Sequence, residues 1–227
     1  MLLGAFALSS CTARIDGNIN VNGSAVLSVN VSIGQRAAAL IRSLAAAGGQ
    51  ESSQILDGQA LSKSLSQSPG IESVSFKNTS QTAIDGQIKI SNINLFLTES
   101  DGKRFVNFSQ EPAGGKCVFS INLDNSRAIL GQLSKDVSDY LNAIMAPAAT
   151  GEKMTKTEYL ELVTSFYNKG ISDEISASKV RVSVDFPGAI TSVKGGTYSG
   201  KKANFDIPLV DLLVLQTPLV YEVNWKN

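Results

Sequence analysis

Apolar and polar residues alternate with a period of two at both ends of the chain, and this pattern constrains the fold more than any other feature. Residues 13–21 alternate in this way, Asn22-Gly23 follows, and residues 25–33 alternate again. Asn-Gly between two alternating segments is the strongest short signal for a β-hairpin. The same period predicts further strands at 71–78, 82–92, 104–110, 116–123, 179–186 and 219–225.

Between these strands the spacing of apolar residues changes to that of helices. Helices are predicted over 35–47, 53–66, 127–145 and 157–168, with Gly48-Gly49, Pro69-Gly70, Pro147 and Gly170 as their ends. Asp124 or Ser126 is the expected N-cap of the third, whose apolar stripe is Ile129, Leu130, Leu133, Val137, Leu141 and Ile144.

Strands at both ends of the chain that flank helical segments predict an α+β fold. We expect a mixed, mainly antiparallel sheet formed by N- and C-terminal strands and packed with helices. Residues 207–215 are almost wholly apolar, with Asp211 as the interruption. They are expected to form a short buried helix or a central strand, and the alternative is the lining of an apolar ligand site or a membrane-facing edge.

The charge composition narrows the range of functions. The 227 residues include 20 Lys and Arg, 20 Asp and Glu, and no histidine. A chain without net charge or a basic block is not expected to bind nucleic acid or an anionic membrane surface. Without histidine, the common zinc sites and the Ser-His-Asp and Cys-His catalytic arrangements are excluded. We therefore expect that the protein is not an enzyme and that it holds no cofactor.

The N-terminus carries the most specific motif of the sequence. Residues 1–10 form an uncharged apolar run that is too short to span a bilayer but has the composition of a signal-peptide core. Leu8-Ser9-Ser10-Cys11 has the form of a bacterial lipobox, which predicts cleavage after Ser10 and lipid attachment, with acyl chains such as palmitate, at Cys11. The basic segment that normally precedes the core is missing, so the signal peptide is expected to be truncated at its N-terminus. The remaining residues 11–227 are expected to form one domain with a helical insertion at about 126–170.

The other candidate sites have simpler structural explanations. If Cys11 carries lipid, Cys117 is expected to be a thiol in the core of a strand. The carboxylate pairs Asp173-Glu174, Asp136/Asp139 and Glu158/Glu161 are expected on solvent-facing helix surfaces. The dipeptides Asp16-Gly17, Asp85-Gly86 and Asp101-Gly102 are expected to be turns. Lys194-Gly195-Gly196 and Gly200-Lys201-Lys202 predict a hairpin loop, and we expect no metal site.

Two segments resemble a known family. They are the hairpin that follows Cys11, at 11–33, and Val180–Ile190 with its Phe186-Pro187-Gly188 turn, followed by the Gly-rich segment Gly195–Phe205. Together they resemble the LppM-like bacterial lipoprotein domain. The resemblance implies an envelope lipoprotein with a mixed α/β domain that is suited to lipid or glycolipid binding. It carries no catalytic residue over to this chain, and the helical segment 126–170 departs from it.

The sequence therefore predicts a lipid-anchored bacterial envelope lipoprotein that acts as a non-enzymatic binding module for lipid or another amphiphile. Its acyl chains would hold it on the periplasmic face of the inner membrane or on the outer membrane. Two alternatives stay open: a structural or protein-interaction lipoprotein, and a carboxylate-based hydrolase. The ligand-binding residues are not predicted by the sequence.

Overall fold

The structure is a computed structural model that describes residues 12–47, 55–96, 98, 104–130 and 135–227. Within these residues the strands are β1 (Thr12–Ile19), β2 (Ala25–Ser32), β3 (Ile71–Ser80), β4 (Ala83–Ile90), β5 (Val106–Glu111), β6 (Gly114–Ile121), β7 (Lys179–Asp185), β8 (Ala189–Lys194), β9 (Thr197–Ser199), β10 (Lys202–Pro208) and β11 (Leu219–Lys226). The helices are α1 (Gln35–Ala47), α2 (Gly58–Leu65), α3 (Leu123–Leu130), α4 (Lys135–Ala143), α5 (Pro147–Thr150), α6 (Lys156–Phe166), α7 (Lys169–Ala177) and α8 (Leu209–Val214). The predicted α+β class and mixed, mainly antiparallel pairing are confirmed.

The strands form two sheets. A seven-stranded sheet has the order β3-β4-β2-β1-β7-β10-β9, and a four-stranded sheet has the order β5-β6-β11-β8. All neighbours are antiparallel except β1 and β7, which run parallel with Thr12 opposite Lys179. The N-terminal and C-terminal thirds therefore share the larger sheet through β1 and β7, whereas the last strand, β11, joins the smaller one.

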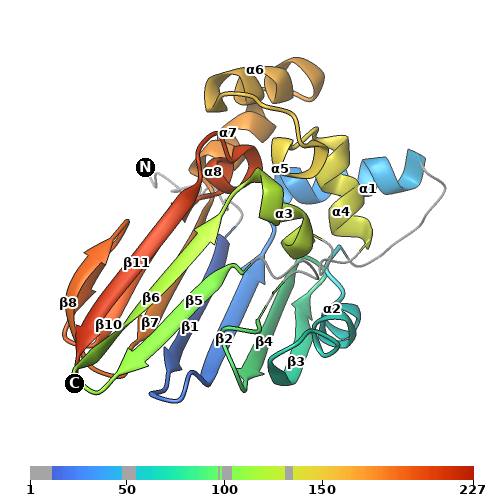
Figure 1. Cartoon of the computed structure of the whole chain (residues 1–227). Helices are drawn as coiled ribbons and strands as arrows, with labels where there is room; N and C mark the ends of the chain where they lie inside the picture. Colours follow the sequence, from blue (N-terminus) through green and yellow to red (C-terminus); the bar gives the residue numbers. More distant parts are fainter. Residues whose placement is uncertain (1–11, 48–54, 97, 99–103, 131–134) are drawn as a thin grey trace, which may run out of the picture.

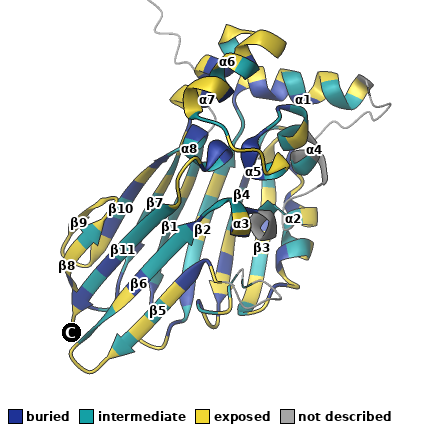
Figure 2. Cartoon of the chain, turned by 45° about the horizontal axis from the view of Figure 1, so that its top comes forward, coloured by how far each residue is buried: buried dark blue, intermediate teal, exposed yellow. Residues whose placement is uncertain are grey.

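The two sheets enclose the main hydrophobic core. Alternate residues of each strand point inward, and side chains such as Ile84, Phe205, Cys117 and Trp225 belong to one buried cluster. Figure 1 shows the smaller sheet lying in front of the larger one, with most helices gathered at one end of both sheets and α2 beside β3. Figure 2 shows buried positions alternating with exposed ones along the strands, as expected for strands with one face on a core.

The helical end has a core of its own. Tyr159 and Val163 of α6, Ile171 and Ile175 of α7, and Val214 of α8 are buried together there. Thr155 forms a capping box with Glu158 that fixes the start of α6: the backbone N–H of Glu158 donates to Thr155, and that of Thr155 donates to Glu158.

Several predicted boundaries are confirmed, and others are wrong. The first hairpin and the helix at 35–47 lie where predicted, and 207–215 contains the predicted short buried helix, α8. The helix predicted from 53 starts at Gly58, because the Asp57 carboxylate accepts the N–H groups of Gln59 and Ala60. Asn122, rather than Asp124 or Ser126, caps α3. Gly170 ends no helix: it lies in α7, which was not predicted.

The structure describes two helices, α3 and α4, within the segment predicted as one helix at 127–145. Of its predicted apolar stripe, Leu141 and Ile144 pack with the helical core. Leu133 and the side chains of Ile129 and Val137 lie outside the described part. Pro147 follows as the first residue of α5, where its ring is compatible with helix geometry.

Two predicted turns are strand interiors. Asp16-Gly17 lies in β1 and Asp85-Gly86 lies in β4, whereas Asp101-Gly102 is outside the described residues. Gly86 is directly opposite Phe76, and a Cβ on Gly86 would overlap the Phe76 ring. The glycine is therefore required by the close approach of an aromatic side chain from the neighbouring strand.

We expect Gly86→Ala to lower the free energy of unfolding by about 1–3 kcal/mol, because the added methyl group overpacks the site occupied by Phe76. Urea denaturation measures the change. Phe76→Leu in the Gly86→Ala background should recover part of the loss, since the smaller side chain leaves room for the methyl group. Equal stability of Gly86→Ala and the unchanged chain would contradict this explanation.

Candidate functional site

An apolar cavity of about 250 Å3 lies where the larger sheet meets the helices. The sheet contributes the first residues of β1, β4 and β7 and the last residues of β2. β1 and β4 run antiparallel to β2, and β7 runs parallel to β1. The first residues of β1, β4 and β7 and the last residues of β2 therefore lie at the same end of the sheet. Residues of α1, α4, α7 and α8 and of the segment around α2 complete the wall.

The lining is mainly aliphatic. Its polar members are Thr12, Ser32, Asp57 and Lys179, together with the aromatic hydroxyl of Tyr140. Asp57 and Lys179 are exposed, so they lie where the cavity meets solvent. The aliphatic members are Ala13, Val31, Ile33, Ala37, Ile41, Leu56, Leu61, Ile84, Leu141, Ile144, Ile175, Val180, Leu209 and Leu213. A lining of this kind offers few hydrogen-bond partners to water.

Glu174 of α7 fixes α1 over this cavity. Its two carboxylate oxygens accept the backbone N–H groups of Arg36, at 3.2 Å, and Ala37, at 3.0 Å. These N–H groups belong to the first turn of α1, where they have no partner within the helix. Glu174 is 9% exposed, and the negative charge at a helix N-terminus is favourable. The contact joins two helices whose residues Ala37 and Ile175 both line the cavity.

We expect Glu174→Ala to lower the free energy of unfolding by about 1–3 kcal/mol, because the Ala37 N–H is left buried without its acceptor. Amide hydrogen exchange at the start of α1 should accelerate, which mass spectrometry can follow. The matched control is Asp173→Ala, since Asp173 pairs with Lys169 on the surface and an exposed pair contributes little. Equal effects of the two substitutions would contradict the role of Glu174.

Ser178 and its neighbours position α8 against the cavity. The Ser178 hydroxyl donates to the Glu174 carbonyl oxygen, at 2.6 Å, and the Leu209 N–H donates to the Ser178 carbonyl oxygen, at 2.9 Å. The start of α8 is thereby attached to the end of α7. Leu209 and Leu213 then face the cavity, while Val210 and Val214 pack into the helical core. The segment 207–215 is thus both a short buried helix and part of an apolar lining.

The predicted carboxylates whose side chains are described have different structural roles. Glu174 caps α1, and Asp173 forms an ion pair with Lys169. Glu158 belongs to the capping box of α6, where hydrogen bonds from Thr155 lower its pKa. Glu161 is exposed on α6. The side chains of Asp136 and Asp139 lie outside the described part.

Cys117 is buried in β6, as predicted for a core thiol. Burial raises the pKa of its thiol to about 12, so the thiolate is scarce at neutral pH. The predicted lipidation residue Cys11 and the recognition residues Leu8, Ser9 and Ser10 lie outside the described residues. Among the described residues, no helix is long and apolar enough to cross a membrane, and no group of three potential metal-ligating side chains is found.

Part of the glycine- and lysine-rich segment near the C-terminus forms a hairpin, in which β9 pairs antiparallel with β10 and Gly200-Lys201 connects the two strands. Lys194-Gly195-Gly196 forms no hairpin loop: Gly195, in the left-handed region with φ of 81°, connects β8 of the smaller sheet to β9 of the larger one. The Lys201 ammonium group donates to the Pro187 carbonyl oxygen, and Lys202 forms an ion pair with Asp185 at 3.4 Å. These lysines therefore stabilise the hairpin and its neighbouring strand.

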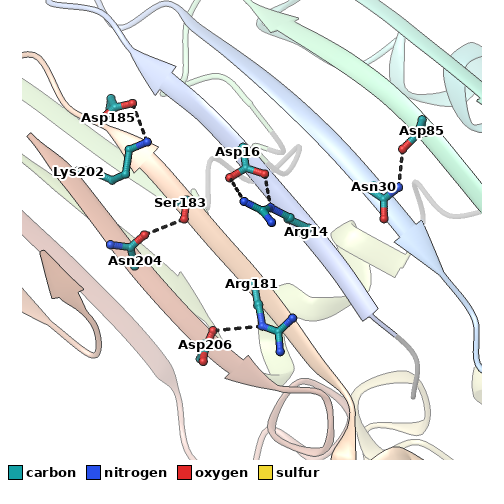
Figure 3. A network of polar contacts seen from close by, with 10 residues as sticks. All are labelled: Arg14, Asp16, Asn30, Asp85, Arg181, Ser183, Asp185, Lys202, Asn204 and Asp206. Atoms are coloured by element: carbon teal, nitrogen blue, oxygen red, sulfur yellow. Dashed lines mark hydrogen bonds and ion pairs between the residues drawn. The ribbon is translucent and has the colours of Figure 1, made fainter. Parts of the chain in front are cut away.

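The outer face of the larger sheet is polar. Figure 3 shows Arg14 hydrogen-bonded to Asp16 on β1, Asn30 on β2 to Asp85 on β4, and Ser183 on β7 to Asn204 on β10. Arg181 and Asp206 form a longer ion pair of 3.8 Å across β7 and β10. Their side chains are both 62% exposed, and exposed pairs of this kind contribute about 0–1 kcal/mol. This face is therefore polar and largely solvated.

Comparisons with known proteins give a likeness among solved structures. No family model matches the chain, and no curated protein matches it. Among solved structures, the folded domain of the Mycobacterium tuberculosis LppM protein, determined by NMR, matches with a TM-score of 0.41 and 12% sequence identity. The match covers 96% of this chain and 90% of that chain.

Proposed function

We propose that this chain is a lipid-anchored bacterial envelope protein whose domain binds the hydrocarbon part of a lipid or another amphiphile. The observation that carries the proposal is the aliphatic cavity between the end of the larger sheet and the helices. Its described lining is mainly aliphatic, so the proposed role is binding without catalysis.

The size of the cavity limits the ligand. Small-molecule pockets usually have volumes of about 300–1,000 Å3, and an engineered cavity of about 150 Å3 holds benzene. A cavity of about 250 Å3 therefore suits one hydrocarbon chain or a small apolar body rather than both chains of a phospholipid. Each methylene group that it removes from water contributes about 0.8 kcal/mol. The exposed charges of Asp57 and Lys179 lie where a polar head would remain in solvent.

Lipid extraction and native mass spectrometry of the protein purified from membranes test the binding. We expect a co-purifying lipid, and we expect a fluorescent fatty acid to bind the chain in which Cys11 is replaced by Ser. Absence of both would overturn the proposed ligand. For the anchor, Cys11→Ala should leave the protein unprocessed or soluble, and unchanged membrane partitioning of that variant would overturn the anchor.

A second candidate function is a protein-interaction lipoprotein, which one exposed aromatic residue favours. Phe166 at the end of α6 is 66% exposed, whereas such side chains are usually buried in soluble domains. It lies within the helical segment 126–170, which departs from the family resemblance. Crosslinking in membranes separates the two functions: a stable protein partner that is lost in Phe166→Ser, without a bound lipid, would favour the second.

A further inference from the structure

The described structure starts at the wall of the cavity. Thr12 and Ala13, the first two residues of β1, both line it. Cys11 directly precedes them in sequence, and consecutive Cα atoms are about 3.8 Å apart. A group attached to Cys11 therefore begins within one residue of the cavity.

The sheet holds Thr12, the residue that follows the attachment point in sequence, in place. Thr12 pairs with Ser32 of β2 on one side and with Lys179 of β7 on the other. The Thr12 and Ser32 hydroxyl groups are 3.0 Å apart and share a hydrogen bond. Because β1 is an inner strand of a seven-stranded sheet, Thr12 is fixed beside Lys179, the exposed residue at the opening of the cavity.

We infer that the cavity takes up one of the acyl chains carried by Cys11 of the same molecule. This inference rests on the proposed function, since it requires both the lipidated cysteine and a cavity that accepts hydrocarbon. The volume of about 250 Å3 suits one chain, so the remaining acyl chains would still anchor the protein in the bilayer.

The covalent attachment to Cys11 favours binding of its own acyl chain over binding of a free lipid. A ligand held by a short linker reaches an effective concentration on the order of millimolar, far above that of a dilute free lipid. Exposing an acyl chain to water costs about 0.8 kcal/mol per methylene group, whereas bilayer and cavity are both apolar. The chain can therefore exchange between the two without a large hydrophobic penalty, and a free ligand has to displace it.

A photoactivatable probe tests the inference. Bacteria that produce the full chain are fed a palmitate analogue bearing a diazirine, which is incorporated at Cys11, and intact membranes are irradiated. Proteolysis and mass spectrometry then locate the crosslinks. We expect them on peptides that contain Ala37, Ile175 and Leu213. As a matched control, eight prolines inserted between Cys11 and Thr12 move the tether by roughly 25 Å, and labelling of these peptides should fall at least tenfold.

The same probe, added free to the Cys11→Ser chain, separates this inference from the proposed function. If the free probe labels the cavity peptides and the tethered probe crosslinks only to membrane lipid, the inference is overturned and the binding function stands. If the tethered probe alone labels them, the inference is supported and binding of free lipid is not. Labelling in neither case, or equal labelling in the proline-insertion variant, overturns the inference.

Discussion

Replacing Ala37 by phenylalanine is expected to weaken binding of a fluorescent fatty acid to the Cys11→Ser chain at least tenfold. Ala37 lies in the first turn of α1, is 4% exposed and lines the cavity. An aromatic ring at this position would occupy much of a space of about 250 Å3 and leave no room for a hydrocarbon chain. A tenfold loss corresponds to about 1.4 kcal/mol of binding free energy.

Ala39 provides the matched control, since it lies in the same helix and is exposed. Ala39→Phe should leave the affinity unchanged, and circular dichroism should show that both variants are folded. If folded Ala37→Phe bound the fatty acid as tightly as the unchanged domain, the cavity would not be the binding site.

The largest effect on stability is expected for Trp225→Ala, which should lower the free energy of unfolding by about 3–5 kcal/mol. Trp225 of β11 is 3% exposed. Its ring lies between Phe108, at 5.5 Å, and Phe186, at 5.3 Å between ring centroids. Its indole N–H donates to the Gln110 side-chain oxygen at 3.1 Å. The residue thus joins β5, β11 and the turn before β8 in one aromatic cluster.

Thermal unfolding measures this effect, with a fall in melting temperature of roughly 10 °C for a chain of this size. Trp225→Phe should cost less, because it keeps the ring contacts and loses the hydrogen bond. Figure 1 places the end of β11 opposite the helical end, so fatty-acid binding well below the transition should be unaffected in Trp225→Ala. A loss smaller than 1 kcal/mol would contradict the role of this cluster.

Local patterns predicted the elements well where neighbouring residues determine them. The first hairpin follows from alternation and Asn22-Gly23, and α1 follows from its apolar spacing and the glycines after it. The α+β class follows from the order of these elements. Asp16-Gly17 was misassigned because the local dipeptide favours a turn. The glycine is instead required by the Val26 carbonyl oxygen and by Leu27 of the partner strand, whose positions no local pattern reveals.

The sequence alone could not predict the apolar cavity. Its lining comes from the ends of four strands and from five helical regions that are far apart in sequence, and each residue alone is an ordinary core side chain. The apolar segment 207–215 was the one local signal, and it did yield two lining residues. Glu174 was predicted to face solvent, and this prediction is wrong. Its carboxylate accepts a hydrogen bond from Arg36 at the N-terminus of α1, and the two residues are 138 positions apart in sequence, so no local pattern reveals the contact.

The parallel pairing of β1 with β7 has a consequence for how the protein folds. Thr12 to Asn18 pair with Lys179 to Asp185, so the first strand cannot complete its ladder until more than three quarters of the chain has been synthesised. Contacts so distant in sequence raise the contact order and slow folding. Until β7 arrives, one edge of the β1–β2 hairpin stays open to pairing with other chains, which is a recognised route to aggregation. The newly made chain is therefore expected to depend on chaperone protection for longer than a domain built from local hairpins.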